Sequence, residues 1–198
     1  MSPVESVSPD WRLENLWRPM GSTEAVHGSL DDPTLSCVHP VTAELATYWR
    51  DLRREGRLPS RSDLDPLQMR AILPHLVMWD VEPTKDDGAH AFRFRLIGTE
   101  STTAYGLSTG KYLHDVLADA ALERHLWVME RVVNEAVPLR NIGRALRKSR
   151  TWLVTEAVAT PLFEDERVNV ILAAVVRWPE NDPPEAVRRN WRTADIAD

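Results

Sequence analysis

The chain has 198 residues, of which 43% are hydrophobic and 27% charged, and its formal net charge is −6. This composition is ordinary for a soluble globular protein, and the acidic balance argues against a nucleic-acid-binding surface, which is usually basic. A single cysteine, Cys37, excludes an intramolecular disulfide and a cysteine-based structural zinc site.

No apolar run approaches the roughly 20 residues that span a bilayer, and the N-terminus lacks the basic and apolar regions of a secretory signal. We therefore expect a cytoplasmic protein without membrane contact. Residues 1–40 have little periodicity and are expected to form a flexible segment. Residues 41–178 are expected to form the folded domain, and residues 179–198 a polar tail that is either loose or a short helix.

The first clear helix is expected over Val41–Glu55. Leu45, Trp49 and Leu52 lie on one face of this helix, and Gly56 ends it.

A second, short helix is expected to begin at Asp65. Asp65 is a suitable cap, Pro66 fits the first turn, and Gln68 stands where a capping-box partner would. Pro74 ends this helix.

Two antiparallel strands are expected next, over His75–Val81 and Phe92–Ile97, joined by the polar turn of residues 83–90. In the second strand, apolar residues alternate with Arg93 and Arg95, so that one face is apolar and the other largely charged.

Short helical turns are expected over Glu100–Tyr105, and the longest helix over Ala118–Ala136. The apolar residues of the long helix recur every three or four positions; they are Leu122, Leu126, Met129 and Val133.

Three further strands are expected over Leu139–Arg147, Trp152–Pro161 and Val168–Trp178, and the last is apolar enough for a central strand. This order of elements predicts an α+β fold. Its five-stranded antiparallel sheet carries helices on one face and is preceded by an N-terminal helical extension.

The order of these elements resembles the PAS sensory domain. More narrowly, Leu58–Glu82 and Phe92–Leu113 resemble a PAS-like family found mainly in alphaproteobacteria. The resemblance covers roughly residues 41–178 and implies a PAS fold that is often dimeric and often binds a ligand. It implies neither a catalytic residue nor a family-wide cofactor. The pieces that carry it are Leu58–Arg61, Asp65–Pro66, Leu73–Pro74, Arg95–Thr99, Gly106 and Thr109–Gly110.

Two cofactor types of PAS relatives can be tested against the sequence. Flavin photosensors carry an asparagine–cysteine motif in the short helix after the second strand, but Glu100–Tyr105 contains no cysteine and Cys37 lies far outside it. PAS haem sensors take an axial histidine from the long helix, where His125 lies. A surface or hydrogen-bonded histidine is the simpler interpretation of His125, and haem is the alternative. No metal-ligand spacing occurs, so no metal site is predicted.

A PAS-type pocket between the sheet and the helices has four candidate ligand-binding residues, Tyr105, Trp127, Trp152 and, with the haem alternative, His125. The competing interpretation of these side chains is ordinary core packing.

A polar set on the strands consists of Arg93, Arg95, Arg144 and Glu156. Ion pairs across strands are expected here, and binding of an anionic ligand is the alternative.

Two functional hypotheses follow. The first is a stand-alone sensory or regulatory module, not an enzyme, that binds a small molecule and signals to an unknown protein through protein–protein contacts. The second is a ligand-free interaction module that acts by dimerisation. A third, an enzyme on a curved sheet, would need an acid or histidine inside the cavity. A pocket with convergent polar groups would favour the first hypothesis, and a packed core the second.

A homodimer is expected, because Trp11, Trp17 and the stripe of Leu45, Trp49 and Leu52 offer more apolar surface than a single PAS core needs.

Overall fold

The computed structural model describes residues 24–26, 29–32, 34–54, 57–85, 88–145, 153–165, 167–179 and 181–188. No helix in this described part is both long and apolar enough to cross a membrane. The helices and strands, in chain order, are β1 (Glu24–Val26), β2 (Ser29–Asp32), α2 (Pro40–Leu52), the 3-10 turns η1 (Arg61–Asp63) and η2 (Leu73–His75), β3 (Leu76–Pro83), β4 (His90–Ile97), α3 (Thr102–Tyr105), α4 (Leu113–Val116), α5 (Asp119–Glu135), β5 (Leu139–Ala145), β6 (Leu153–Glu164) and β7 (Arg167–Pro179).

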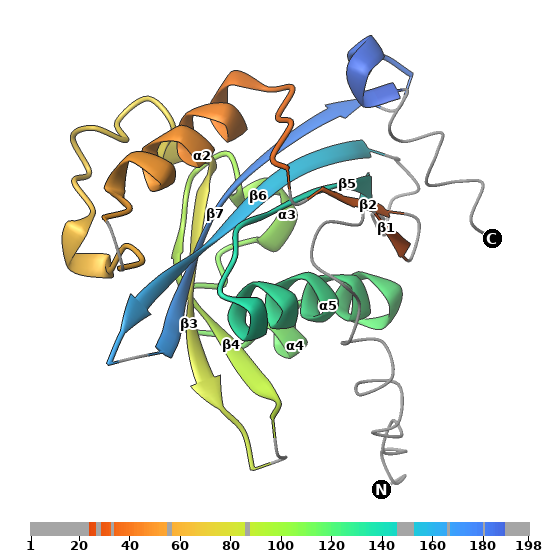
Figure 1. Cartoon of the computed structure of the whole chain (residues 1–198). Helices are drawn as coiled ribbons and strands as arrows, with labels where there is room; N and C mark the ends of the chain where they lie inside the picture. The colour runs from red at the N-terminus through yellow and green to blue at the C-terminus, as the bar shows by residue number, and fades with distance from the viewer. Residues whose placement is uncertain are drawn as a thin grey trace, which may run out of the picture.

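The strands form one antiparallel sheet in the order β1-β2-β5-β6-β7-β3-β4 (Figure 1). The five predicted strands are present as β3 to β7, so the predicted α+β fold is confirmed. The structure adds a hairpin, β1 and β2, that pairs with β5. This hairpin lies within residues 1–40, where the sequence predicts a flexible segment, so that prediction is wrong for the hairpin. Trp11 and Trp17 lie outside the described residues.

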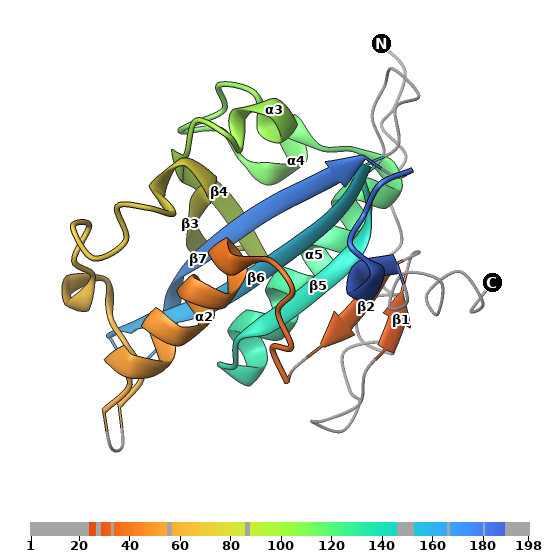
Figure 2. The ribbon, with the colours of Figure 1, turned by 90° about the horizontal axis from the view of Figure 1, so that it is seen from above.

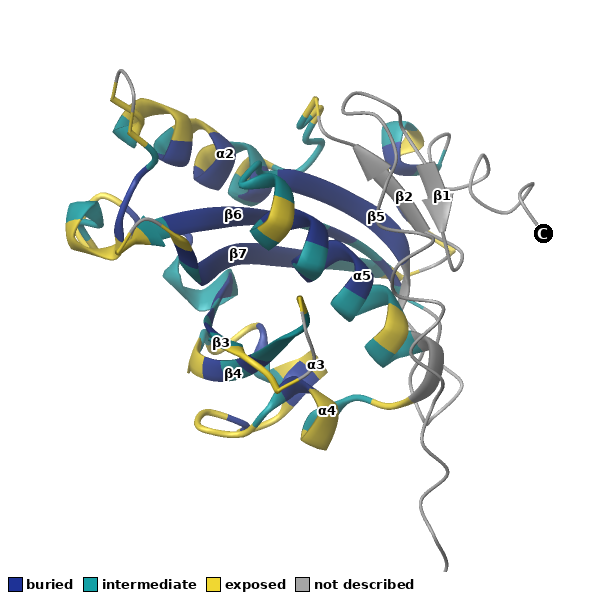
Figure 3. Ribbon diagram, turned by 60° about the horizontal axis from the view of Figure 1, so that its bottom comes forward, coloured by how far each residue is buried: buried dark blue, intermediate teal, exposed yellow. Residues whose placement is uncertain are grey.

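Helices cover both faces of the sheet. The predicted face carries α3, α4 and α5, whereas α2, the predicted N-terminal extension, lies on the opposite face (Figures 1 and 2). Strands β6 and β7 are enclosed between α2 and α5 and are buried over most of their length (Figure 3). Because each face of these strands contacts a helix, β7 is apolar without interruption from Val170 to Val176, whereas β6 also contains Thr155, Glu156 and Thr160.

Successive residues of β6 face opposite layers of the fold. Ala157 and Ala159 belong to the core on the α5 side, whereas Val158 and Leu162 belong to the core under α2. The strand therefore contributes to two separate hydrophobic clusters.

The stripe predicted on the first helix packs against the sheet of the same chain. Leu45 and Trp49 are buried on the face of α2 that packs on the sheet. Trp49 Nε1 donates a hydrogen bond to the carbonyl oxygen of Pro161 at 2.7 Å. Both residues contact the same cluster as Leu162 and Leu172 of the sheet. The stripe is thus not an exposed surface, and the argument for a homodimer that depended on it is wrong. The dimer itself stays a prediction.

A buried ion pair anchors the start of α2 to the sheet. Glu156 on β6 is 0% exposed and Arg140 on β5 is 1% exposed, and Arg140 Nε donates to Glu156 Oε1 at 2.7 Å. The same carboxylate accepts hydrogen bonds from Val38 N at 2.9 Å, His39 N at 2.8 Å and Thr42 Oγ1 at 2.7 Å. These partners compensate the hydration that the carboxylate loses on burial.

The short helix predicted at Asp65 is not formed. Asp65 does act as a cap, because its Oδ1 accepts from Leu67 N at 2.9 Å. The predicted capping box is absent, since Gln68 Nε2 donates to the side chain of Asp65 at 3.0 Å and the Asp65 N–H donates to Tyr48 Oη. Residues 66–72 nevertheless form successive turns. Only Met69 and Ile72 of this segment are buried, which gives a helix too little apolar surface to pack through.

Part of the predicted C-terminal tail is packed on the domain. Residues 185–188 form one helical turn, and Val187 is fully buried against Ile142 and Val154, beside Trp178.

Candidate functional site

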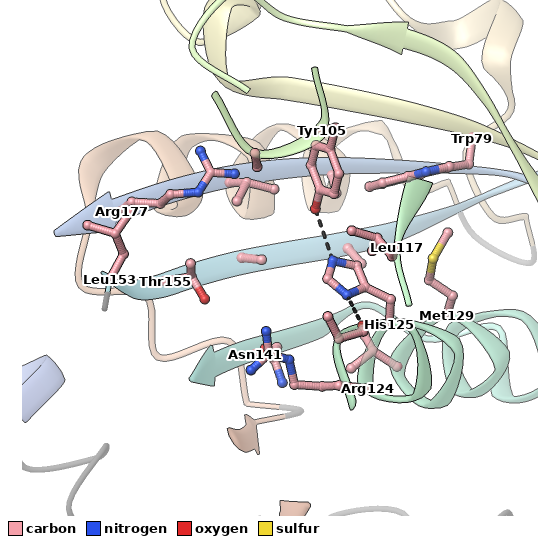
Figure 4. Close-up of a pocket in the computed structure, with 17 residues that line it drawn as sticks. Trp79, Tyr105, Leu117, Arg124, His125, Met129, Asn141, Leu153, Thr155 and Arg177 are labelled. Carbon is pink, nitrogen blue, oxygen red and sulfur yellow. Dashed lines mark hydrogen bonds between the residues drawn. The ribbon is translucent and has the colours of Figure 1, made fainter. Parts of the chain in front are cut away.

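A pocket of about 140 Å³ lies between the sheet and α5, on the face opposite to α2 (Figure 4). Strands β5, β6 and β7 form its floor, and residues of β3, α3 and α5 complete its walls. Most of the lining side chains are apolar. A mainly apolar cavity with a few polar groups is the usual form of a small-molecule site.

Small side chains on β6 and β7 leave the space for this pocket. Three cross-strand pairs line the floor, and alanine occupies half of their positions. Because an alanine side chain ends at Cβ, nothing larger rises from these positions to fill the gap beneath α5. The pairs, in order along the floor, are Thr155–Arg177, Ala157–Val175 and Ala159–Ala173.

Tyr105 from α3 and His125 from α5 meet in the middle of the pocket (Figure 4). Tyr105 Oη lies 3.1 Å from His125 Nε2, and His125 Nδ1 lies 2.6 Å from the carbonyl oxygen of Ala121. Because a carbonyl oxygen can only accept, Nδ1 carries the proton, and Nε2 of the neutral ring accepts from the Tyr105 hydroxyl. The Tyr105 oxygen can still accept a hydrogen bond from a ligand.

Burial keeps both members of this pair neutral. Burial, together with the charges of Arg124 and Arg177, lowers the pKa of His125 to about 4, while the contact with Ala121 acts in the opposite direction. Burial also raises the pKa of Tyr105, against the effect of the same two arginines. At pH 7 the pocket therefore contains a neutral tyrosine–histidine pair in the field of two guanidinium groups.

One end of the pocket is polar. Arg177, Thr155, Asn141 and Arg124 lie toward this end in Figure 4. Arg177 Nη1 donates to Thr103 Oγ1 at 3.2 Å, which helps to position the guanidinium. The strand register agrees with this arrangement, because Thr155 pairs with Arg177 and Asn141 lies one pair further in, opposite Ala157.

Trp79 lies toward the opposite, apolar end of the pocket (Figure 4). Its ring centroid is 5.5 Å from that of Phe94 and 6.0 Å from that of Tyr105. Trp79 is 3% exposed, and its Nε1 has no hydrogen-bond partner among the described residues. A buried donor left without a partner costs about 1–3 kcal/mol, and an acceptor atom of a ligand would remove that cost.

The structure brings together two of the four predicted site residues, Tyr105 and His125. Trp127 does not line the pocket; it is 5% exposed in the core, with the Arg131 guanidinium 4.9 Å above its ring. Two positions along a helix turn a side chain by roughly 200°, so Trp127 and His125 face different ways. Trp152 lies outside the described residues.

The sequence interpretation missed Trp79, Arg124 and Arg177 as lining residues. The sequence could have indicated Arg177, because it is the first charged residue after the apolar run of β7. Arg124 is the neighbour of His125, but only the orientation of α5 shows that both reach the pocket.

The polar set predicted on the strands is divided in the structure. Arg93 Nη2 and Arg95 Nη1 both form cross-strand ion pairs, at 2.9 and 2.7 Å, but their partner is Asp80, which the predicted set did not include. Glu156 lies elsewhere, buried on the α2 face, because the even positions of β6 point away from α5. The side chain of Arg144 lies outside the described residues.

The two cofactor types do not fit this pocket. Cys37 packs beside the cluster under α2, on the opposite face of the sheet, where it cannot reach a flavin in the pocket. A cavity of about 140 Å³ has the size that accepts a benzene molecule, far below that of a haem. His125 Nε2, the atom that would ligate iron, already accepts the Tyr105 hydroxyl.

A second cavity, of about 330 Å³, lies where the end of α5 approaches the β3–β4 hairpin and the β6–β7 turn. Its polar lining residues are His90, Asn134 and Arg167. His90 Nδ1 is bound to Glu130 Oε2 at 2.7 Å, and the other two residues are exposed. Its polar groups do not converge inside the fold, so the pocket beneath α5 is the stronger candidate.

A family profile, among the comparisons with known proteins, assigns the chain to a family. No curated protein matches the sequence. Among solved structures, one similar chain is described as "Structure of an RNA-binding Light-Oxygen-Voltage Receptor", with a TM-score of 0.45 and 14% sequence identity. The alignment covers 90% of this chain but 44% of that one, so the chain spans less than half the length of that protein. A family profile described as "PAS domain" matches residues 37–175, well over half of the chain. The chain therefore belongs to the PAS domain family.

Proposed function

We propose that this PAS domain is a sensory module that binds a small molecule in the pocket beneath α5 and signals through contacts with another protein. Membership of the PAS family supports a sensory role in general. The single observation that carries the proposal is a cavity of about 140 Å³ into which polar groups converge. Two such groups, Tyr105 and His125, come from different helices and meet there.

The cavity favours this function over a ligand-free interaction module. A protein that used its core only for stability would gain by filling the space above Ala157, Ala159 and Ala173, because each buried methylene contributes about 0.8 kcal/mol. The unpartnered N–H of Trp79 is likewise a cost that a ligand can offset.

The position of His125 gives little support to an enzyme. A histidine inside the cavity was the requirement for that alternative, but both ring nitrogens of His125 are engaged. A pKa of about 4 also makes its ring a weak base at neutral pH. We therefore propose a non-catalytic module.

Strand β6 supports a route by which the signal leaves the pocket. Thr155 and Ala157 face the ligand site, and Glu156 between them holds the start of α2 from the other face. A ligand that displaces β6 would therefore also shift Glu156 and its hydrogen bonds to the start of α2. We propose α2 and the segment that precedes it as the element that reports occupancy to a partner protein.

We also propose that the protein is cytoplasmic and forms a homodimer. The stripe of Leu45 and Trp49 is already used within the chain, so a dimer would need another surface. Leu67 and Leu107 are the most exposed large apolar residues of the described part, at 82% and 89%.

A cavity-filling variant tests the function. Native mass spectrometry of freshly purified protein should show bound mass that is lost on denaturation. Ala159→Leu should remove that mass while leaving the thermal midpoint unchanged or higher, because leucine occupies the ligand's space. Ala71→Leu, at an exposed position, is the control and should retain the ligand.

Two outcomes would contradict the proposal. One is a clean apo mass together with no stabilisation of the protein by any compound in a small-molecule thermal-shift panel. The other is bound mass that persists in both Ala159→Leu and Ala157→Val, which alter neighbouring rows of the floor.

A further inference from the structure

The chemical class of the ligand can be argued from the pocket, provided that the proposed ligand-binding function holds. The first constraint is size. A volume of about 140 Å³ matches a single six-membered ring with at most a small substituent. Longer chains and fused ring systems would extend beyond this volume.

The second constraint is charge. Two arginines, Arg124 and Arg177, are among the lining residues, and no aspartate or glutamate of the described chain lines the pocket. Both arginines line the same pocket as His125 and lower the pKa of its ring. A cationic ligand would be repelled here and an anionic one attracted, more strongly than in bulk water because the cavity walls are apolar.

The third constraint is polarity along the pocket. From the rim residue Leu153 inward, the rows of the floor change from Thr155–Arg177, through Ala157–Val175, to Ala159–Ala173. The polar row therefore lies near one end of the floor and the apolar rows lie toward the other. The walls follow the same order, with Arg124 and Asn141 near the first row and Trp79 and Met129 toward the opposite end (Figure 4). A fitting ligand therefore has its charge at one end and an apolar body at the other.

From these constraints we propose that the pocket binds a small aromatic carboxylate with one ring. The carboxylate lies between Arg124 and Arg177, and the ring lies over the floor alanines against Trp79 and Met129. A guanidinium matches a carboxylate in shape and charge and forms two parallel hydrogen bonds with it. The Trp79 N–H selects rings that carry an acceptor atom, and the Tyr105 oxygen selects rings that carry a donor.

Isothermal titration calorimetry of the full chain with benzoate and benzamide tests this inference. The two probes have the same ring and nearly the same volume, but only benzoate is charged. Benzoate should bind at least tenfold more tightly than benzamide, and acetate, which lacks the ring, should not bind measurably. The preference for benzoate should fall as salt is added, because ions screen the arginine charges.

Arginine variants locate the charge. Arg177→Gln and Arg124→Gln should each weaken benzoate binding about tenfold and leave benzamide within about twofold. Arg70→Gln, at an exposed position remote from the pocket, is the matched control and should change neither. Thermal midpoints close to that of the native chain would show that the variants are folded.

The outcomes separate this inference from the function on which it depends. Equal affinities for benzoate and benzamide, both abolished by Ala159→Leu, would overturn the preference for an acid and leave the ligand-binding function standing. Benzoate binding that survives Ala159→Leu or both arginine variants would place the anion outside the pocket and also overturn it. If neither probe binds, the inference fails. The proposed function fails with it only when the native mass is that of the apo chain and no compound of the thermal-shift panel stabilises the protein.

Discussion

His125 makes the stability of the domain depend on pH. Its pKa is lowered from 6.5 to about 4 in the folded chain, so between these values the unfolded chain binds more protons than the folded one. Stability is therefore complete above pH 6.5 and is lost as pH falls toward 4. The loss from this one residue amounts to about 2 kcal/mol at pH 4.5, because each pKa unit corresponds to roughly 1.4 kcal/mol.

Urea denaturation of the native chain and of His125→Gln at pH 7 and pH 4.5 measures this contribution. Between the two pH values the native chain should lose about 2 kcal/mol more unfolding free energy than the variant, since glutamine does not titrate. His114→Gln, at an exposed histidine, is the control and should behave like the native chain. Equal losses in the native chain and His125→Gln would show that His125 does not resist protonation.

Residue roles were only partly predictable. Tyr105 and His125 are suggested by residue type and by position on elements near a PAS-type pocket. Their contact joins residues 20 positions apart on two helices, and no periodicity within either helix encodes it. Trp127 has the same residue-type signal as Trp79, but its direction depends on the rotation of α5 against the sheet. That rotation is set by the packing of the whole core.

At the scale of elements, α2 depends on a single acidic side chain of β6. Glu156→Gln would keep one acceptor oxygen and place an NH2 donor against the N–H group of either Val38 or His39, which bind different oxygens of the carboxylate. It would also leave the buried charge of Arg140 without its counter-ion. The expected loss of unfolding free energy is about 3–5 kcal/mol, typical of breaking a buried ion pair from one side.

Chemical denaturation followed by tryptophan fluorescence checks this loss. The exposed Glu100→Gln is the control and should stay within about 0.5 kcal/mol of the native chain. A loss below about 1 kcal/mol for Glu156→Gln would mean that water replaces the missing charge and that α2 is held mainly by its apolar face.

Elements with strong periodicity were predicted well, and those without it were not. The apolar residues of strand β4 and helix α5 recur with periods of two and 3.6 residues, because each element has one buried face and one face exposed to solvent. The predicted cap, Asp65, accepts a hydrogen bond from Leu67 N although residues 66–72 form turns, so a capping residue by itself does not establish a helix. Hairpin β1–β2 is short and carries no clear alternation; its strand character depends on pairing with β5, which sequence alone does not show.

At the scale of the whole molecule, hairpin β1–β2 protects the edge of the sheet. Ser29–Asp32 pairs with residues 140–143 of β5, and removing it would expose a row of backbone N–H and C=O groups. The fold itself should survive, because the anchor of α2 begins at Val38. A chain lacking residues 1–33 should therefore keep its circular dichroism spectrum and self-associate as concentration rises.

Light scattering coupled to gel filtration measures this self-association. A chain lacking only residues 1–22 retains the hairpin and is the matched control; it should keep the oligomeric state of the full chain. The same oligomeric state in both truncated chains, over a tenfold range of concentration, would show that an uncovered β5 edge is harmless.

The alternation of β6 between two layers also limits how the chain can vary. Every odd position from 153 to 159 lines the ligand pocket, and every even position from 154 to 158 meets the layer under α2. Inserting or deleting one residue would exchange the two sets, bring Glu156 into the pocket and place pocket residues beneath the helix. The alternation of side chains along β6 therefore has to be kept in register. Insertions and deletions are tolerable only at the ends of the strand. In related chains we expect gaps to gather in the β6–β7 turn, while the spacing between the pocket positions and Glu156 stays fixed.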